Sequence, residues 1–444
     1  MDNMLSVLED KAAGIGACSL LEHHGKKVLL DCGYCDSQVP GPKITTFPVP
    51  AGTIDIVILT HGHLGHCGLL PVLVREGFTG KVYCTEDCQK IAMLSLLENS
   101  LSQEEEKQYW KSKKPERAVE PLYSEKEVMA CSSFFVACDY HKNVEISDDL
   151  TISFFNAGHS PGSALVKICL KDNGKEKNVL LAGDVGLREN DLNAEALISN
   201  SYDTLLLPAC NAVTEEEESI ESKLAQIINQ TDEAEGNIVI PAFSIDRRDA
   251  ILNLLKDLLA AGEIPRIFAF VDSPIAGKQI EALPWRYEDS EVYPCIQIFD
   301  SVEGSKNLNQ IRGTIIIIAG YGRGGYGRIG FHLLRNIGRP ESAVVLFGDK
   351  RDHPIWKALG EGEKTVSILD KEVQVKAKLL QLKDPGVHLD VSRMVDWLGQ
   401  MKSPLGHIYI THGESEAKNG FRGMLEKHGI KEVHVPQPGK QVTL

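Results

Sequence analysis

The chain has 444 residues, more than one ordinary domain holds, and this length predicts two domains. Hydrophobic residues make up 43% and charged residues 25%, so each half can bury a core of its own. The net charge of −15 repels phosphate backbones and argues mildly against nucleic acid, although a local basic surface stays compatible with it. No run approaches the roughly 20 apolar residues of a membrane span. Eleven cysteines fit reduced thiols, and we therefore expect a cytoplasmic protein without a membrane partner.

The first 200 residues alternate short β-rich runs with turn residues. The predicted strands are 26–33, 55–62, 81–85, 150–159, 164–170 and 177–184, and the predicted helices are 69–77 and 89–101. The charged run 103–117 predicts a solvated helix or loop. Its basic residues are more simply a solvated helix face than a binding surface.

After residue 214 strands and helices alternate. Strands 237–243, 266–272, 314–320 and 342–348 enclose the predicted helices 247–262 and 327–338, and strands 407–413 and 432–436 close the chain. This alternation is typical of parallel βαβ units.

Three histidines follow the apolar strand 55–62 in the sequence THGHLGHCG, residues 60–68. His61 and His63 stand two positions apart beyond the strand end, so their rings project to one side. Neutral imidazole is the commonest zinc ligand, and catalytic zinc takes three protein ligands and a water. The pattern favours a metal site over a polar surface turn.

Other polar residues stand where further apolar strands end: His159, Asp184 and His412. Taken singly, each is more simply a hydrogen-bonded loop residue. Together with His61 and His63 they predict one constellation.

The order H-x-H-x-x-H, then AGH, AGD and THG, resembles the metallo-β-lactamase superfamily over nearly the whole chain. The segments PAFSIDR (241–247), FVDSPIAG (270–277) and THGE (411–414) resemble its β-CASP branch of RNA-processing nucleases. The resemblance implies an α/β fold, an αββα metallo-β-lactamase sandwich with an inserted parallel α/β (β-CASP) domain. The expected limits are 1–205 and 372–444 for the sandwich and 206–371 for the insertion.

The resemblance also implies roles for single residues. Six match the family's metal ligands: His61, His63 and His159 for a first zinc, His66 and His412 for a second, and Asp184 between the two. Asp31 matches a residue that orients a ligating histidine. His388 of GVHLD matches a histidine that donates a proton to the leaving oxygen, so catalysis would fall to His388 and Asp184.

The chain departs from the family pattern at three places. Gly65 stands where the family has an aspartate that binds the second zinc, and the acidic partner of His388 aligns with Pro208. The loop AGYGRGGYGR (319–328) replaces the usual form with serine and methionine. We therefore expect one firmly bound Zn²⁺ and a weakened second site.

The same glycine-rich loop is the expected contact with substrate. Glycine-rich backbone that opens a helix can cradle phosphate, arginine binds it with two hydrogen bonds, and tyrosine stacks on bases. Arg323 and Arg328, together with Arg247 of PAFSIDR, are the candidate substrate-binding residues. A plain surface loop is an equal alternative.

The leading hypothesis is a zinc-dependent ribonuclease that hydrolyses phosphodiesters of single-stranded RNA, with chemistry impaired by Gly65 and Pro208. Two alternatives stand beside it: a catalytically degenerate homologue that binds RNA or a partner protein, and a metallo-hydrolase of small esters or phosphodiesters. The retained histidines favour the first hypothesis, the two departures favour the second, and the acidic charge keeps the third open. The sequence leaves the choice between endonuclease and exonuclease open, and also the oligomeric state, for which a homodimer is one option.

Overall fold

The computed structural model describes residues 3–10, 13–35, 47–186, 201–209, 219–242, 244–278, 295–308, 310–320, 327–348, 354–383, 389, 391–401 and 405–444. The chain forms two compact units. The first contains residues 1–96, 125–215 and 386–444, and the second contains residues 97–124 and 216–385.

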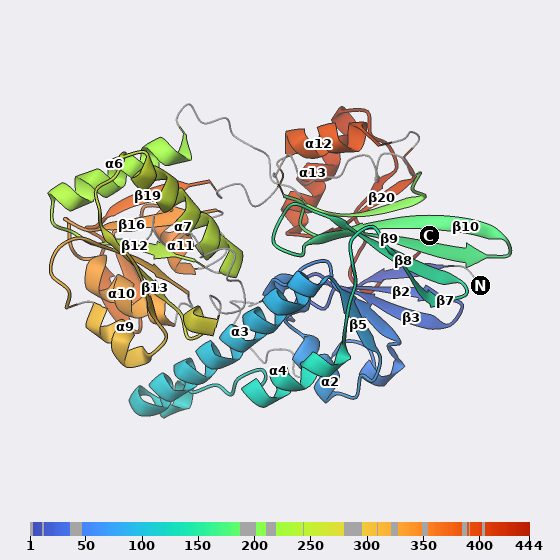
Figure 1. Cartoon of the computed structure of the whole chain (residues 1–444), viewed down its shortest axis with the longest axis horizontal. Helices are drawn as coiled ribbons and strands as arrows, with labels where there is room; N and C mark the ends of the chain where they lie inside the picture. Colours follow the sequence, from blue (N-terminus) through green and yellow to red (C-terminus); the bar gives the residue numbers. More distant parts are fainter. Residues whose placement is uncertain are drawn as a thin grey trace. The chain divides into compact units, whose positions relative to one another are not determined.

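The first unit contains two seven-stranded sheets (Figure 1). One sheet has the order β22-β1-β2-β3-β4-β5-β6, with strands Gln441–Thr443, Met4–Val7, Ser19–His23, Lys26–Leu30, Ile56–Ile58, Lys81–Cys84 and Phe135–Ala137. The other has the order β21-β20-β11-β10-β9-β8-β7, with strands Val433–His434, His407–His412, Thr204–Pro208, Lys175–Ala182, Ala164–Asp172, Leu150–Asn156 and Asn143–Ser147.

The two sheets bury a common apolar core, because alternate side chains of a strand point to opposite faces. Val28, Ile58, Ile152, Val166 and Leu206 belong to this core. A second core covers the outer face of the second sheet, where α12 (Val391–Gly399) and α13 (Ser415–Lys427) pack. The helices α1 (Leu64–Cys67), α2 (Leu70–Arg75) and α4 (Glu125–Cys131) belong to the same unit as the first sheet. The predicted αββα sandwich is confirmed.

The sandwich brings together the loops that follow several strands. β3, β4 and β5 are parallel neighbours, and β10, β11 and β20 are parallel neighbours in the other sheet. β8 is antiparallel to β9, and β9 is antiparallel to β10, so β8 and β10 end at the same edge. The loops carrying the predicted ligands therefore leave their strands at shared sheet edges.

The second unit is built on a six-stranded parallel sheet in the order β14-β13-β15-β12-β16-β19. Its strands are Ile296–Phe299, Phe268–Asp272, Ile315–Ala319, Ile238–Pro241, Ala343–Phe347 and Lys378–Leu382, and the hairpin β17–β18 spans Thr365–Ile368 and Lys371–Gln374. One face packs α6 (Ile220–Glu233) and α7 (Ile245–Ala260), and the other packs α9 (Val302–Leu308), α10 (Arg328–Asn336) and α11 (Pro354–Gly360). The predicted parallel insertion is confirmed.

The two units divide the chain near residues 215 and 386, and one further segment belongs to the second unit. Helix α3 (Glu86–Lys113) begins in the first unit, but residues 97–124 belong to the second. Ion pairs explain this, because Glu98 bonds Arg248 and Glu105 bonds Arg328. Such partners lie far apart in the chain, so a strand-and-helix pattern does not reveal them.

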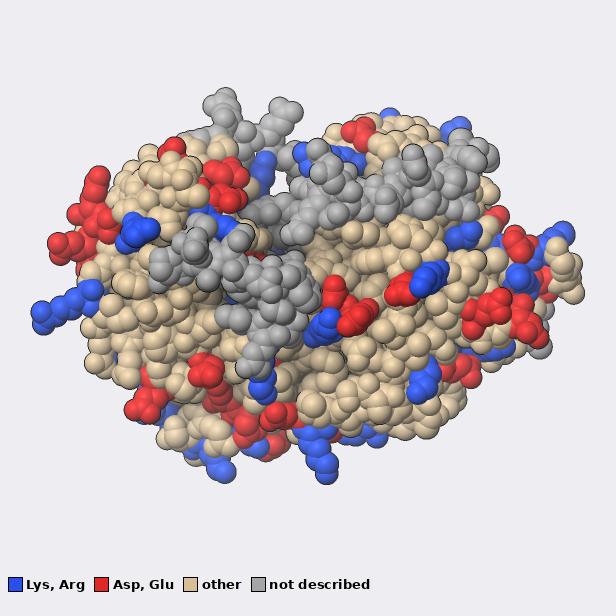
Figure 2. Space-filling view, in the orientation of Figure 1, with Lys and Arg blue, Asp and Glu red and all other residues tan. Residues whose placement is uncertain are grey.

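The basic run after residue 106 is largely paired within the second unit. Lys107 Nζ lies 2.8 Å from an oxygen of Glu120, and Lys114 and Arg117 both bond Asp370. Figure 2 shows basic side chains scattered among acidic ones on the visible face, leaving aside the residues drawn in grey. Within the part of the chain that the structure describes, no helix combines the length and apolarity needed to cross a membrane.

Candidate metal centre

The histidine-rich segment turns sharply after β4 into the short helix α1. His63 precedes the first residue of α1, and its carbonyl accepts hydrogen bonds from the backbone N–H groups of His66 and Cys67. Thr60, His61 and His66 are buried. The turn therefore gathers three imidazoles in one protected region.

Three imidazole nitrogens converge on one point. Nδ1 of His63 lies 3.1 Å from Nε2 of His61 and 3.2 Å from Nε2 of His159. Zinc bonded tetrahedrally at its usual distance to nitrogen holds two nitrogens about 3.3 Å apart. Oδ2 of Asp184 lies 3.5 Å from Nε2 of His61 and 3.7 Å from Nε2 of His159. One ligand atom from each of the four residues lies within 4.8 Å of the others, so this group could hold a divalent metal.

Asp31 and Thr60 hold the rings in place from behind. Oδ1 of Asp31 accepts the Thr60 backbone N–H at 2.8 Å, and its Oδ2 lies 2.7 Å from Nδ1 of His66. The Thr60 hydroxyl lies 3.1 Å from Nδ1 of His61. These contacts leave Nε2 of both rings facing Asp184, as a metal ligand requires.

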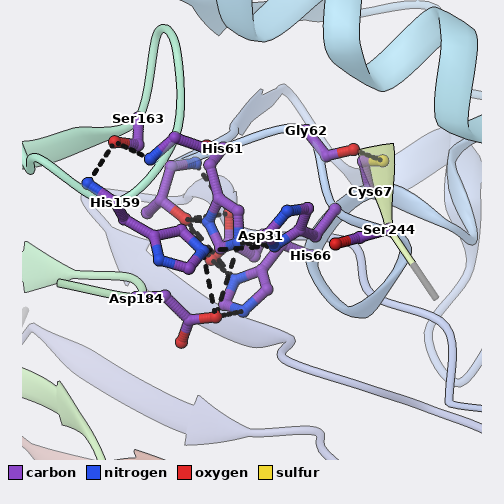
Figure 3. A network of polar contacts seen from close by, with 12 residues as sticks. Asp31, His61, Gly62, His66, Cys67, His159, Ser163, Asp184 and Ser244 are labelled. Atoms are coloured by element: carbon purple, nitrogen blue, oxygen red, sulfur yellow. Dashed lines mark hydrogen bonds and ion pairs between the residues drawn. The ribbon is translucent and has the colours of Figure 1, made fainter. Parts of the chain in front are cut away.

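His66 presents a buried nitrogen without a hydrogen-bond partner among the described residues. Its Nε2 faces Oδ2 of Asp184 at 3.7 Å, too far for a hydrogen bond. Figure 3 shows His61, His66 and His159 around the Asp184 carboxylate. A buried imidazole nitrogen without a partner is costly unless something binds it, so this atom fits a metal ligand.

His412 lies beside His66 but is held by residues that the motifs did not reveal. The two ring centres are 5.1 Å apart. Nδ1 of His412 lies 2.9 Å from Oε1 of Glu9, and Lys418 binds the other oxygen of that carboxylate. Although burial alone raises the pKa of Glu9, His412 and Lys418 outweigh it and lower the pKa to about 2. Glu9 and Lys418 lie outside every recognised motif, so their role is visible only in the fold.

Gly65 is not required by the backbone. Its φ lies outside the left-handed region, and a Cβ placed on it would meet no atom within 4 Å. The neighbouring Gly33 differs, because a Cβ there would come within 1.7 Å of the Gly65 carbonyl oxygen. The fold thus demands glycine at 33, whereas position 65 has room for a side chain.

Burial and neighbouring charges set the protonation of the two buried rings. Burial, reinforced by His66 and His63, lowers the pKa of His61 well below its usual value. Burial alone also lowers the pKa of His66, but the carboxylates of Asp31 and Asp184 outweigh it and raise that pKa. The neutral His61 is therefore ready to act as a ligand at neutral pH.

Of the expected substrate-binding and catalytic residues, the structure describes Arg328 and Arg247 and leaves Arg323 and His388 outside the described residues. Arg328 is buried, and its guanidinium bonds Asp272 and Glu105, which counts against a contact with substrate in this conformation. Arg247 is half-buried, with a long 3.5 Å contact to the Phe347 carbonyl. Pro208 ends β11 opposite His412 and offers no carboxylate there.

Two family models match the chain. The model of the metallo-beta-lactamase superfamily matches residues 12–213, and the model of the Beta-Casp domain matches residues 250–354. Both matches agree with the sandwich and the parallel insertion.

Several curated proteins are similar over most of the chain. A ribonuclease of Thermus thermophilus is 27% identical, with 97% of each chain covered. The transcription termination factor FttA of Methanosarcina mazei is 24% identical over 90% of this chain, which spans 65% of that protein's length. An RNase J-like protein of Methanocaldococcus jannaschii is 22% identical, over 90% of this chain and 89% of that one.

A solved structure also has this fold. A protein of unknown function from Enterococcus faecalis matches all of both chains with a TM-score of 0.55 and 11% identity. At this identity the likeness concerns the fold alone.

Proposed function

The chain belongs to the metallo-β-lactamase superfamily, in its β-CASP branch of RNA-processing nucleases, and from this premise we propose that it is a zinc-dependent ribonuclease with a weakened second metal site. Single-stranded RNA is the proposed substrate, and phosphodiester hydrolysis is the proposed reaction. The named ribonuclease relatives support the substrate class.

One observation carries the proposal, the convergence of three imidazole nitrogens at 3.1 and 3.2 Å with the Asp184 carboxylate beside them. Nitrogen lone pairs that face one another repel unless a proton or a cation lies between them. Three nitrogens and one carboxylate oxygen are a donor set that suits zinc. His61, His63, His159 and Asp184 would hold the first ion.

A bound zinc would supply a Lewis acid that polarises a phosphoryl oxygen and lowers the pKa of water. The chain's own residues would orient the metal ligands, donate the proton and bind the phosphates. Asp31 and Thr60 fix the orientation of His66 and His61. His388 is the proposed proton donor to the leaving oxygen, and Arg247 and Arg323 are the proposed phosphate contacts. Arg328 is left out of this set because internal carboxylates already bind its guanidinium.

The second ion would depend on His66, His412 and the shared Asp184. The orphaned Nε2 of His66 supports such a site. Gly65 supplies no ligand atom, although the backbone has room for one. We therefore propose about one firmly bound zinc per chain and partial occupancy of the second position.

The test combines metal analysis with an RNA cleavage assay. The full chain is purified without added metal, its zinc content is measured, and a labelled single-stranded RNA is incubated with it. His61→Ala/His63→Ala should lose both the firmly bound zinc and the cleavage. His428→Ala, on the exposed end of α13, is the matched control and should keep both.

Three outcomes would change this assignment. Cleavage that survives in His61→Ala/His63→Ala would place the activity elsewhere. Hydrolysis of a small phosphodiester with RNA left intact would favour the small-substrate hydrolase. Zinc and RNA binding without any cleavage would favour the second candidate, a degenerate RNA-binding homologue, which the missing carboxylates at Gly65 and Pro208 support.

A further inference from the structure

A second histidine and carboxylate group lies where three β-hairpins of the first unit turn. His24 and Gly25 join β2 to β3, Asp148 and Asp149 join β7 to β8, and the β9–β10 turn follows Asp172. Figure 1 shows the ends of these hairpins together at the right-hand edge, near both chain termini. β10 begins here and runs toward Asp184, so this group lies at the opposite end of the sheet from the candidate metal centre.

The group, which we call the hairpin-end group, consists of His23, His24 and Asp149. Each offers one ligand atom, and these atoms lie within 4.8 Å of one another. Oδ2 of Asp149 lies 2.9 Å from Nδ1 of His24 and 3.6 Å from Nε2 of His23. His23 and His24 come from one sheet and Asp149 comes from the other, so the group bridges the sandwich.

His23 carries the strongest sign of a missing ligand. Its side chain is 0% exposed, and Nε2 makes no hydrogen bond of ordinary geometry with a described residue. Its nearest neighbour is Asp149, through both the carboxylate and the backbone. Its Nδ1 lies 2.6 Å from Oδ1 of Asn3, an oxygen that only accepts, so Nδ1 carries the proton. Nε2 then directs a lone pair toward the Asp149 carboxylate. Two acceptors that face each other repel, whereas a cation between them binds both.

The surrounding contacts have the form of outer partners of metal ligands. Nε2 of His24 lies 3.1 Å from Oδ1 of Asp172, and Asn3 holds His23 in the same way. A ligating histidine usually donates its other N–H to a carboxylate or carbonyl oxygen, which fixes the ring. Asp149 also accepts the Ser147 hydroxyl at 2.5 Å. Each of the three ligand candidates is thus held by a second residue.

The backbone of His24 supports a specific placement of this ring. His24 has φ of 46°, in the left-handed region, and the following Gly25 has φ of 84°. Two-residue hairpin turns of this kind usually contain asparagine or aspartate before glycine. Histidine is one of the few residue types besides asparagine and aspartate that adopt the left-handed region readily, so the turn holds the His24 ring in a defined place without unusual strain.

We propose that His23, His24 and Asp149 bind one transition-metal ion of the zinc class, separately from the candidate metal centre. Two imidazoles and one carboxylate suit such an ion better than magnesium or calcium, which prefer all-oxygen sites. His24 and Asp149 are 31% and 23% exposed, so a water can complete the coordination. The carboxylates of Asp149 and Asp172 outweigh the single ammonium of Lys26, which lies 3.4 Å from Asp149. Because the ligands come from both sheets, a bound ion ties the sheets together.

The test is a zinc titration of the full chain after chelation, followed by calorimetry. His24→Asn keeps a residue that tolerates the left-handed region, and Asp149→Asn keeps the side-chain shape. Each should lose one binding equivalent relative to the parent, with affinity at that site falling more than about 100-fold. Asp172→Asn and Asn3→Ala remove outer partners only and should weaken the site about 10–100-fold.

A surface cluster offers a matched control. His407, Glu432 and His434 also lie within ligand distance of one another, but their side chains are 53%, 62% and 43% exposed. His407→Ala/His434→Ala should therefore leave the titrated equivalent in place. Equal stoichiometry in the parent, His24→Asn and Asp149→Asn would overturn the inference, as would loss of the equivalent in the control alone. Repeating the titration in His61→Ala/His63→Ala separates this site from the proposed catalytic one, because the equivalent that depends on His24 should persist there.

Discussion

Each unit buries a network of charged and polar side chains, but the two networks differ in how donors and acceptors are matched. In the second unit the five N–H groups of Arg328 meet Glu105, Asp272 and the carbonyls of Phe299 and Asp300. In the first unit imidazole nitrogens face one another at 3.1 and 3.2 Å, and Nε2 of His66 has no hydrogen-bond partner among the described residues.

This difference separates a structural network from a binding site. A buried ion pair with all its hydrogen bonds made is complete, so it holds the fold together without a ligand. In the metal centre, three imidazole nitrogens and one carboxylate oxygen converge on one point, and a cation at that point can bind all four. Both networks contain histidine and carboxylates, so residue type alone does not distinguish them.

The largest expected effect comes from adding a ligand to the candidate metal centre of the first unit. Gly65→Asp adds a carboxylate where the backbone has room for a Cβ, and it returns a ligand to the second site. Groups that orient or activate a reacting proton typically contribute ~10²–10⁴-fold, so we expect RNA cleavage to rise by about 100-fold or more. The cleavage rate and zinc content of the parent and variant are compared at equal protein concentration.

Gly33→Ala is the negative control for this substitution, because a Cβ there would clash with the Gly65 carbonyl and damage the fold. A change of less than about twofold on Gly65→Asp, with zinc content also unchanged, counts against the proposed role of the second site.

A substitution in the Arg328 network of the second unit should change the stability of that unit and not the rate of RNA cleavage. Arg328→Gln leaves the fully buried Asp272 without its guanidinium partner, and breaking a buried pair in this way costs about 3 kcal/mol. Hydrogen exchange of the α10 and β13 amides should therefore accelerate.

Arg323→Gln is the comparison variant, and it should leave exchange unchanged while flattening the log–log salt dependence of RNA binding by about 0.7. Unchanged exchange in Arg328→Gln would show that the network does not stabilise this unit.

A smaller effect is expected from the pH dependence of the same network. Burial alone raises the pKa of Asp272, but His332 and Arg328 outweigh it, and the pKa lies below its ordinary value of 3.8. A carboxyl whose pKa is lowered by folding stabilises the fold above its unfolded pKa, and this contribution is lost as the pH falls through the folded pKa. The stability difference between the parent and Asp272→Asn should thus be constant above about pH 5 and shrink below pH 3.8. Amide exchange in β13, measured for the parent and Asp272→Asn across this pH range, tests this expectation. A stability difference that grows as the pH falls would show that folding does not lower the pKa of Asp272.

The resemblance to the metallo-β-lactamase superfamily implied the αββα sandwich. By itself the sequence determined the order of strands and helices, the parallel βαβ units and the main group of candidate ligands. Apolar runs of period two and the βαβ alternation carry that information locally. His61, His63, His159, Asp184 and His412 were recognisable because each stands where an apolar strand ends, and strand ends meet at shared sheet edges.

Only the tertiary structure decided which polar residues support these groups. Glu9 bonds His412 and Lys418 across more than 400 positions of sequence, and Glu105 binds Arg328 across 223 positions. Arg328 is an example. Its place after a glycine-rich loop, at the start of a helix, predicted a phosphate contact, but in the fold its guanidinium bonds the internal carboxylates of Glu105 and Asp272. The pairing of side chains depends on which strands and helices become neighbours. Local periodicity does not indicate which elements become neighbours. A charged residue looks the same in the sequence whether it faces water, a substrate or a buried partner.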